Sequence, residues 1–157
     1  QEWRGPLREA MRFVKNHVET LYDRFAAPLV KDPETALNGA IRLMIDTDPA
    51  AHEAFFTRHK VTKPESRESL LRLFEMVRAG QSTLTSCAWF FDDFGGQEGR
   101  VALRWAARAL ELAAELAPSV ESELLQRLRD IRSNRREIGD AATLYLSVKT
   151  REARGRV

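Results

Sequence analysis

Apolar residues near the start of the chain recur at alternating steps of four and three positions, which is the spacing of one helix face. The residues of this stripe are Leu7, Met11, Val14, Val18, Leu21 and Phe25. Pro6 suits the first turn of a helix, where its missing N–H has no partner to lose, and Pro28 ends or kinks the helix. The pattern predicts a long amphipathic helix between these two prolines.

Two shorter helices are predicted next, and each is opened by an aspartate followed by a proline. Asp32-Pro33 and Asp48-Pro49 both place an N-cap side chain before a proline in the first turn. The apolar residues that these two helices carry are Leu37, Ile41, Met44 and Ile45 in the first, and Ala51, Ala54, Phe55 and Phe56 in the second.

A fourth helix is predicted to start at Pro64 and to run through Gly80, because Leu84, Ala88 and Phe91 stay in phase with its apolar side. We expect one long helix, bent near Gly80, with an aromatic stretch at its C-terminal end. This stretch is Thr85-Ser86-Cys87-Ala88-Trp89-Phe90-Phe91-Asp92-Asp93-Phe94-Gly95-Gly96.

The most apolar helix of the chain is predicted from about Glu98 to Ala117. Its apolar arc covers more than half of the helix, which indicates burial by neighbours on two sides. Further helices are expected after Pro118-Ser119 and from about Asp140, and no segment alternates with the period of a strand. We therefore expect an all-α fold: an antiparallel bundle of roughly six or seven helices around a buried, Ala-, Leu- and Trp-rich central helix. Residues 1–157 fit a single helical domain.

The aromatic stretch is the part of the chain that helix packing explains least. On a helix, Trp89, Phe90 and Phe91 would fan across ~200°, so at least one of them faces a second packing layer, a pocket or a partner. Asp92 and Asp93 would follow at the helix C-terminus, where the macrodipole disfavours negative charge. Either both carboxylates are solvated and simply end the helix, or they face a cation, a hydrogen-bond network or a polar ligand.

Trp89 beside two aspartates has the chemistry of a sugar site, in which an aromatic face packs on the ring and carboxylates accept hydrogen bonds from hydroxyl groups. Packing in a core or against another domain explains the same aromatic residues. The candidates for ligand-facing or partner-facing residues are Trp89, Phe90, Asp92 and Asp93. We predict no catalytic, cofactor-binding or metal-binding residue.

Composition changes this picture little. A net charge of +2 gives no strong indication of nucleic acid or membrane as a partner. No apolar run approaches the ~18–20 residues of a membrane span, and we expect no signal peptide at the start of the sequence. The single cysteine, Cys87, lies among apolar residues and is expected to be a buried thiol. A chain with one cysteine has no internal disulfide, which fits a reducing, cytoplasmic compartment. The chain begins at Gln1 without a methionine, so we expect a piece of a longer protein.

Other chemistries find weaker support. His17, His52 and His59 fall on different predicted helices without the paired spacing of metal ligands. A basic run could contact a phosphate backbone, but the acidic and apolar residues within it favour a solvated helix flank. Its members are Arg127, Arg129, Arg132, Arg135 and Arg136.

A family resemblance rests on the sequence from Thr85 to Asp93 together with Ala106-Ala107-Arg108-Ala109. These residues resemble the C-terminal helical region of an uncharacterised branch of glycoside hydrolase family 57. That helical region is itself a family of domains of unknown function. The stretch Trp3-Arg4-Gly5-Pro6-Leu7-Arg8-Glu9-Ala10 and the pair Gly139-Asp140 match as well, so the resemblance touches nearly the whole chain. The sequence departs from the expected pattern at Ala88, where glycine is expected, and at Gln97 and Gly99, where bulkier residues are expected.

The resemblance implies a helical domain that follows a distorted (β/α) barrel, with the catalytic carboxylates on the barrel and α-linked glucans or related glycosides as substrates. None of that barrel lies in this chain, so no catalytic residue is carried over. By the same resemblance Trp89, Phe90, Asp92 and Asp93 would lie toward the barrel. We expect a non-catalytic accessory domain that packs on the barrel of its parent chain and forms part of the rim of the carbohydrate site. The parent would be a glycoside hydrolase or a glucan-acting transferase.

Two other functions remain open at this point. The first alternative is a structural or protein-interaction bundle without a ligand site, in which exposed aromatics would support a homodimer. A nucleic-acid-binding module that uses the late arginines is the second alternative, and the near-neutral net charge disfavours it.

Overall fold

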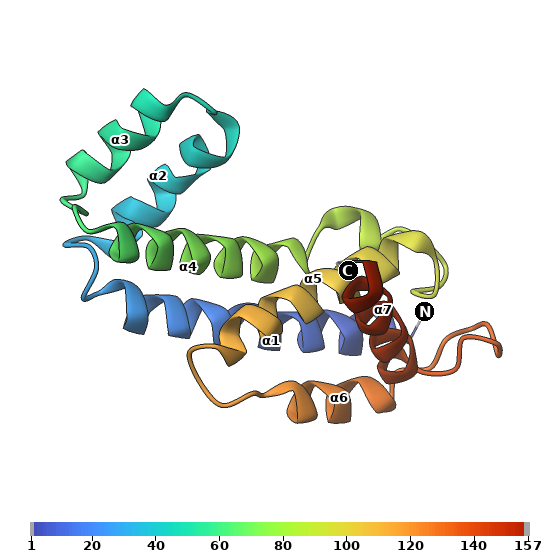
Figure 1. Ribbon diagram of the computed structural model, residues 1–157. Coiled ribbons are helices and arrows are strands. Elements are labelled where there is room, and N and C mark those ends of the chain that lie inside the picture. The colour runs from blue at the N-terminus through green and yellow to red at the C-terminus, as the bar shows by residue number, and fades with distance from the viewer. Residues whose placement is uncertain (1, 156–157) are drawn as a thin grey trace. The chain divides into compact units, whose positions relative to one another are not determined.

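The computed structural model describes residues 2–155, with side chains described for residues 2–150, and these residues are helical without a strand (Figure 1). The helices are α1 (Arg4–Ala26), α2 (Pro33–Ile45), α3 (Pro49–Arg58), α4 (Pro64–Ser82), the 3₁₀ turn η1 (Ser86–Trp89), α5 (Gln97–Ala114), α6 (Glu121–Arg129) and α7 (Ala141–Gly155). The predicted all-α fold is confirmed. Among these residues no helix is both long and apolar enough to cross a membrane.

The chain divides into two compact units. The first unit joins Gln1–Glu19 to Met76–Val157, and the second is Thr20–Glu75. Helices α1 and α4 each contribute residues to both units.

In the second unit, prolines and aspartates set the helix starts as predicted. Pro33 and Pro49 are the first residues of α2 and α3, and each follows an aspartate that caps the helix. The Asp32 carboxylate accepts a hydrogen bond from the Thr35 N–H at 3.0 Å, which gives one of the unpaired N–H groups of the first turn a partner. Local sequence therefore fixes where this helical hairpin begins and turns.

The apolar stripe predicted for α2 does not form the core of this unit. Ile41, Met44 and Ile45 are exposed, and α2 buries the smaller residues Ala36 and Ala40 instead. The reason is a ring cluster of Phe55, Phe56, Phe74 and Tyr22, which supplies the bulk of the core and leaves room only for small residues. Their tilted and edge-to-face geometries are those that aromatic pairs prefer.

In the first unit, α5 is the central helix that its composition predicts. It packs against α7 and η1, and α6 packs against α7. Its buried residues are Gly99, Ala102, Leu103, Ala106, Ala107, Ala109, Leu110, Leu112 and Ala113. Trp105 is only half-buried and lies under the Arg78 guanidinium, at 5.0 Å from the ring centroid. Small residues on two sides of α5 let its neighbours approach closely.

Helix α4 ends at Ser82 and does not carry the aromatic stretch, so the prediction of one helix running to Phe91 is wrong. The fully buried Thr83 follows the last turn, and its hydroxyl donates to the Gly80 carbonyl at 2.6 Å. A side-chain hydroxyl that bonds to a nearby carbonyl competes with the helical backbone pattern, which explains the early end. Gly80 itself lies inside α4 against Val18 of α1.

We predict that Gly80→Ala destabilises the chain, because a methyl group at this position would overlap the Cγ2 atom of Val18. The expected loss is about 1–3 kcal/mol in the free energy of unfolding, measured by urea denaturation. Gly5→Ala is the matched control, since a methyl group there meets nothing within 4 Å. Equal stability of the two variants would contradict the close helix contact.

Helices α6 and α7 are joined through the carboxylate of Glu121. The Tyr145 hydroxyl donates to Glu121 Oε1 at 2.7 Å, and Lys149 Nζ donates to Oε2 at 2.7 Å. Burial raises the pKa of Glu121, but the hydrogen bonds from Lys149 and Tyr145 and the charge of Lys149 outweigh it and lower the pKa below its ordinary value. The charged carboxylate is therefore the form that the folded chain favours.

We predict that Glu121→Gln lowers stability at neutral pH and that this difference shrinks in acid. A carboxyl group whose pKa is lower in the folded chain stabilises it above the unfolded pKa of 4.5, and this contribution is lost as the pH falls through the folded value. Denaturation of both proteins from pH 7 to pH 3 would test this. Glu123→Gln is the control, because the exposed pair of Glu123 with Arg127 contributes at most about 1 kcal/mol. A stability gap that stays constant down to pH 3 would count against the linkage.

Candidate functional site

The aromatic stretch forms the turn η1 and the loop that leads from it into α5, within the first unit. Asp92 and Asp93 consequently lie in this loop and not at the C-terminus of a long helix. The unfavourable interaction with a helix dipole, expected from the sequence, does not arise there. Cys87 is exposed, so the prediction of a buried thiol is also wrong, because η1 turns its side chain outward.

Trp89 is half-buried. It contacts Trp3, which lies just before α1, and Arg8, which lies in α1. Its ring stacks on Trp3 with centroids 6.4 Å apart and an interplanar angle of 23°, and the Arg8 guanidinium lies 5.0 Å from its centroid. Phe94, which is fully buried, meets Trp3 edge to face at 5.7 Å. Trp89 is therefore held in place by the chain itself, with part of its surface left exposed.

The two phenylalanines that follow are exposed. Phe90 exposes 78% of its surface and Phe91 exposes 47%. Their backbone is nevertheless held, because Arg4 Nη2 donates to the Phe91 carbonyl at 2.9 Å. Large apolar side chains on a loop that is fastened in this way form a preformed surface rather than a loose segment.

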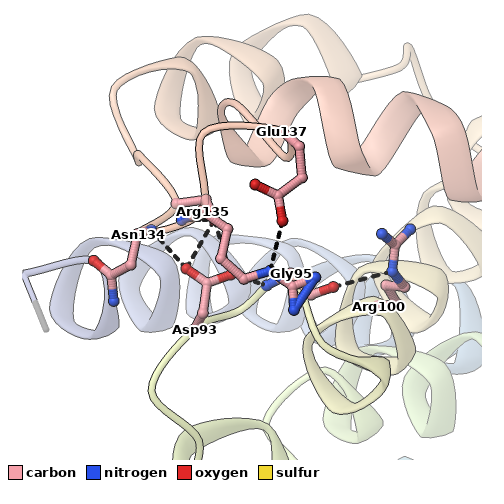
Figure 2. Close-up of polar contacts among 7 residues, drawn as sticks. Asp93, Gly95, Arg100, Asn134, Arg135 and Glu137 are labelled. Carbon is pink, nitrogen blue, oxygen red and sulfur yellow. Dashed lines mark hydrogen bonds and ion pairs between the residues drawn. The ribbon is translucent and has the colours of Figure 1, made fainter.

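The carboxylate of Asp93 is the centre of a hydrogen-bond network, which we call the Asp93 clasp (Figure 2). It accepts from the Gly95 N–H at 2.7 Å, from the Asn134 N–H at 2.6 Å and from the Ser133 hydroxyl, which lies 2.8 Å from both oxygens. The loop before α5 is thereby tied to the loop between α6 and α7. Of the alternatives raised for the two aspartates, Asp93 belongs to a hydrogen-bond network.

Asp92 contributes to the same connection through its backbone. Its carbonyl accepts from Asn134 Nδ2 at 2.6 Å and from the indole N–H of Trp3 at 3.1 Å, while its side chain is exposed. The neighbouring aspartates thus contribute to this connection in different ways: Asp93 through its carboxylate and Asp92 through its backbone carbonyl.

Glycines make the clasp sterically possible. A Cβ atom on Gly95 would lie 2.7 Å from Asp93 Oδ1 and 2.8 Å from Ile138 Cγ1. A Cβ atom on Gly99, in the first turn of α5, would overlap the Phe94 carbonyl. Arg100 Nε donates to the Gly95 carbonyl at 3.2 Å and holds the same turn from the α5 side (Figure 2).

The loop between α6 and α7, which binds the Asp93 carboxylate, is held by its own hydrogen bonds and ion pairs. The Ser133 N–H donates to the Gly139 carbonyl at 2.9 Å, and Gly139 has a φ of 78°, a conformation that favours glycine. Arg132 pairs with Asp140 at 3.6 Å and Arg135 pairs with Glu137 at 3.3 Å. Together with the Arg127–Glu123 pair, these contacts neutralise three of the five arginines in the basic run.

The four predicted site residues lie at the end of η1 and in the loop that follows it, and they have different surroundings. Sequence reasoning missed the partners that hold them: Trp3 and Arg8 for Trp89, and Ser133 and Asn134 for Asp93. The only available signal for the second pair was that Ser133-Asn134 interrupts a helical pattern with two side chains that commonly bond to loops. Among the described residues no cluster of three or more His, Cys, Asp or Glu side chains could hold a metal ion.

Comparison with known proteins adds a family. The chain belongs to the family described as a domain of unknown function, DUF3536, which matches residues 1–153. No curated protein and no solved structure matches the chain. The expectation of a domain family without an assigned function is confirmed.

We predict that Asp93→Asn destabilises the chain by about 1–3 kcal/mol, because its amide group places a donor against donors and removes the charge from several hydrogen bonds. The variant is compared with the wild type by urea denaturation at pH 7. Asp130→Asn is the control with the same change in charge on an exposed side chain, for which a change within about 0.5 kcal/mol is expected. Equal effects of the two variants would show that the clasp carries no stability.

Proposed function

We propose that residues 1–157 form a non-catalytic helical accessory domain of a glycoside hydrolase family 57-like protein, which packs on the catalytic barrel of that protein. The observation that carries the proposal is the exposure of Phe90 and Phe91 on a loop fastened by Arg4 and the Asp93 clasp. Membership of a family without an assigned function is compatible with it. The glycoside hydrolase itself comes from the sequence resemblance.

The energetic reason for a partner at this loop is the cost of leaving aromatic surface in water. Burying apolar surface contributes about 25 cal/mol per Å², so covering two exposed phenylalanines favours association. Because the loop is already held, binding does not have to order it first, which keeps the entropic cost of association low. These are the properties of a docking site whose geometry exists before the partner arrives.

Within this proposal the four candidate residues have different roles. Phe90 makes the contact with the barrel, and its neighbour Phe91 extends the contact. Trp89, with part of its ring exposed, and the outward-facing Asp92 are the residues placed to reach a carbohydrate at the rim. Asp93 acts as a positioning residue, since the chain already occupies its carboxylate.

A structural bundle without a ligand is the second candidate, and the stack of Trp3, Trp89 and Arg8 favours it, because packing alone accounts for Trp89. Trp89→Ala separates the two functions. A loss of about 3–5 kcal/mol in stability would give Trp89 a core role, whereas a small loss together with weaker glucan binding would place it at the rim.

We predict that the chain binds a recombinant family 57 barrel from a protein that carries this type of domain. Calorimetric titration should show at least about a hundredfold weaker binding for Phe90→Ala/Phe91→Ala, since central aromatic residues dominate interface energies. Leu146→Ala is the control, because Leu146 exposes the same 47% as Phe91 but lies on α7.

Three outcomes would contradict the proposal. The first is the absence of binding by the wild-type chain, and the second is equal weakening by the Leu146 control. The third is hydrolysis of an α-glucan by the isolated chain, which would make it catalytic. Sedimentation of the chain alone shows whether Phe90 and Phe91 instead support a homodimer.

A further inference from the structure

A second candidate site lies in the other unit, in a cleft of about 550 Å³ that is lined by residues of α2 and α3. Figure 1 shows the hairpin that these two helices form. This volume falls in the range of small-molecule sites, roughly 300–1,000 Å³. Gly39 of α2 lets the hairpin close at one point, where a Cβ atom would lie only 3.1 Å from the Phe55 ring of α3. Arg42 follows Gly39 by one helical turn, and Arg58 follows Phe55 by one turn. Because the short connection 46–48 makes the two helices antiparallel, these arginines border the cleft toward its opposite ends.

The charge in this cleft is positive and uncompensated. Within the described part of the chain, no hydrogen bond or ion pair engages the guanidinium of Arg42 or Arg58. A smaller hollow of about 200 Å³ shares Thr35, Arg58 and His59 with the cleft and adds Lys31 and Lys60. The cleft thus continues into a second basic surface.

The acidic residues at the edges are already bound by the chain. Asp32 accepts from the N–H and the hydroxyl of Thr35 at 3.0 and 2.7 Å, and Asp46 accepts from the Asp48 N–H at 2.9 Å. Both carboxylates therefore serve the turns that build the hairpin. The cleft and the hollow together have more cationic side chains than carboxylates, so their net charge is positive even without His59. The cations are Arg42, Arg58, Lys31 and Lys60, and the carboxylates are Asp32 and Asp46.

Neutral groups complete the lining. Burial and the Arg58 charge lower the pKa of His59, although Asp32 opposes them, so its imidazole is uncharged near neutral pH and offers a hydrogen-bonding nitrogen. Asn38 adds an amide. Leu43, Ala51, Ala54 and Phe55 give the cleft an apolar part beside these polar groups.

We propose that this cleft binds a small organic phosphate, with Arg42 and Arg58 on the phosphate group and the apolar part against the organic group. A phosphate monoester carries about −1.5 to −2 charge and three acceptor oxygens, so two arginines approaching from different sides can both be satisfied. A planar carboxylate presents only one edge for a paired contact with a guanidinium and has half the charge. The site lies wholly within Thr20–Glu75 and does not depend on the proposed barrel contact.

The test is a titration of the ¹⁵N-labelled 157-residue chain with phenyl phosphate, inorganic phosphate and benzoate at constant ionic strength, followed by NMR. Phenyl phosphate should shift the amide signals of Arg42, Arg58 and His59 and should bind more tightly than either other probe. Signals unchanged at millimolar phenyl phosphate would overturn the site. If benzoate binds as tightly as phenyl phosphate, the proposed preference for phosphate is wrong. If inorganic phosphate binds as tightly, the proposed contact with the organic group is wrong.

The variant Arg42→Gln/Arg58→Gln should bind phenyl phosphate at least about tenfold more weakly, because it loses two charge-assisted contacts. Arg24→Gln/Arg136→Gln removes the same charge from exposed arginines that do not line the cleft, and it should bind as the wild type does. Equal weakening by both double variants would reduce the effect to net charge and overturn the proposal. Both pairs change exposed side chains, and the dispersion of the NMR signals verifies that each variant is folded.

Discussion

The hydrogen bonds accepted by the Asp93 carboxylate are the constraint on which the candidate site depends. Ser133 lies 40 positions along the chain from Asp93 and Asn134 lies 41, so the clasp joins two loops that are far apart in the sequence. A carboxylate satisfied by two backbone N–H groups and a hydroxyl is strongly held, since charge-assisted hydrogen bonds are roughly twice as strong as neutral ones. It fixes the end of the segment that begins at η1. The Arg4 contact to the Phe91 carbonyl fixes the middle of the same segment.

Glycine explains why this segment can approach its neighbours so closely. Gly99 stands where bulkier residues are expected from the family resemblance, and this departure by itself predicts a less stable first turn of α5. In the structure, glycine is needed at position 99, because any larger residue would overlap the Phe94 carbonyl. Phe94 in turn is fully buried against Trp3, which stacks on Trp89. The small residue in α5 and the aromatic stack are therefore parts of one packing arrangement.

The sequence predicts the features that depend on neighbours in the chain. The starts of α2 and α3 follow from a proline after a capping aspartate, and the start of α4 follows from Pro64. The burial of α5 follows from the width of its apolar arc. The failures involve either contacts between residues far apart in the sequence or, for the end of α4, a hydrogen bond from a side chain to the backbone nearby. The apolar stripe of α2 is exposed because aromatic rings from elsewhere fill that core, and α4 stops early because the Thr83 hydroxyl bonds to Gly80. The partners of Asp93 could not be inferred for the same reason, since nothing near Asp93 in the sequence points to Ser133.

The two proposed surfaces differ in the physics of recognition, and this difference determines what each could bind. Phe90 and Phe91 offer apolar area on a fastened loop, and the stabilisation from covering them grows with the area covered, which suits a protein partner. The hairpin cleft offers unpaired guanidinium groups beside a limited apolar lining, which suits a small anion. Salt separates the two experimentally, because screening weakens contacts with a charged ligand and leaves apolar burial largely intact. A partner whose binding to the aromatic loop fell steeply with salt would therefore not be bound through Phe90 and Phe91.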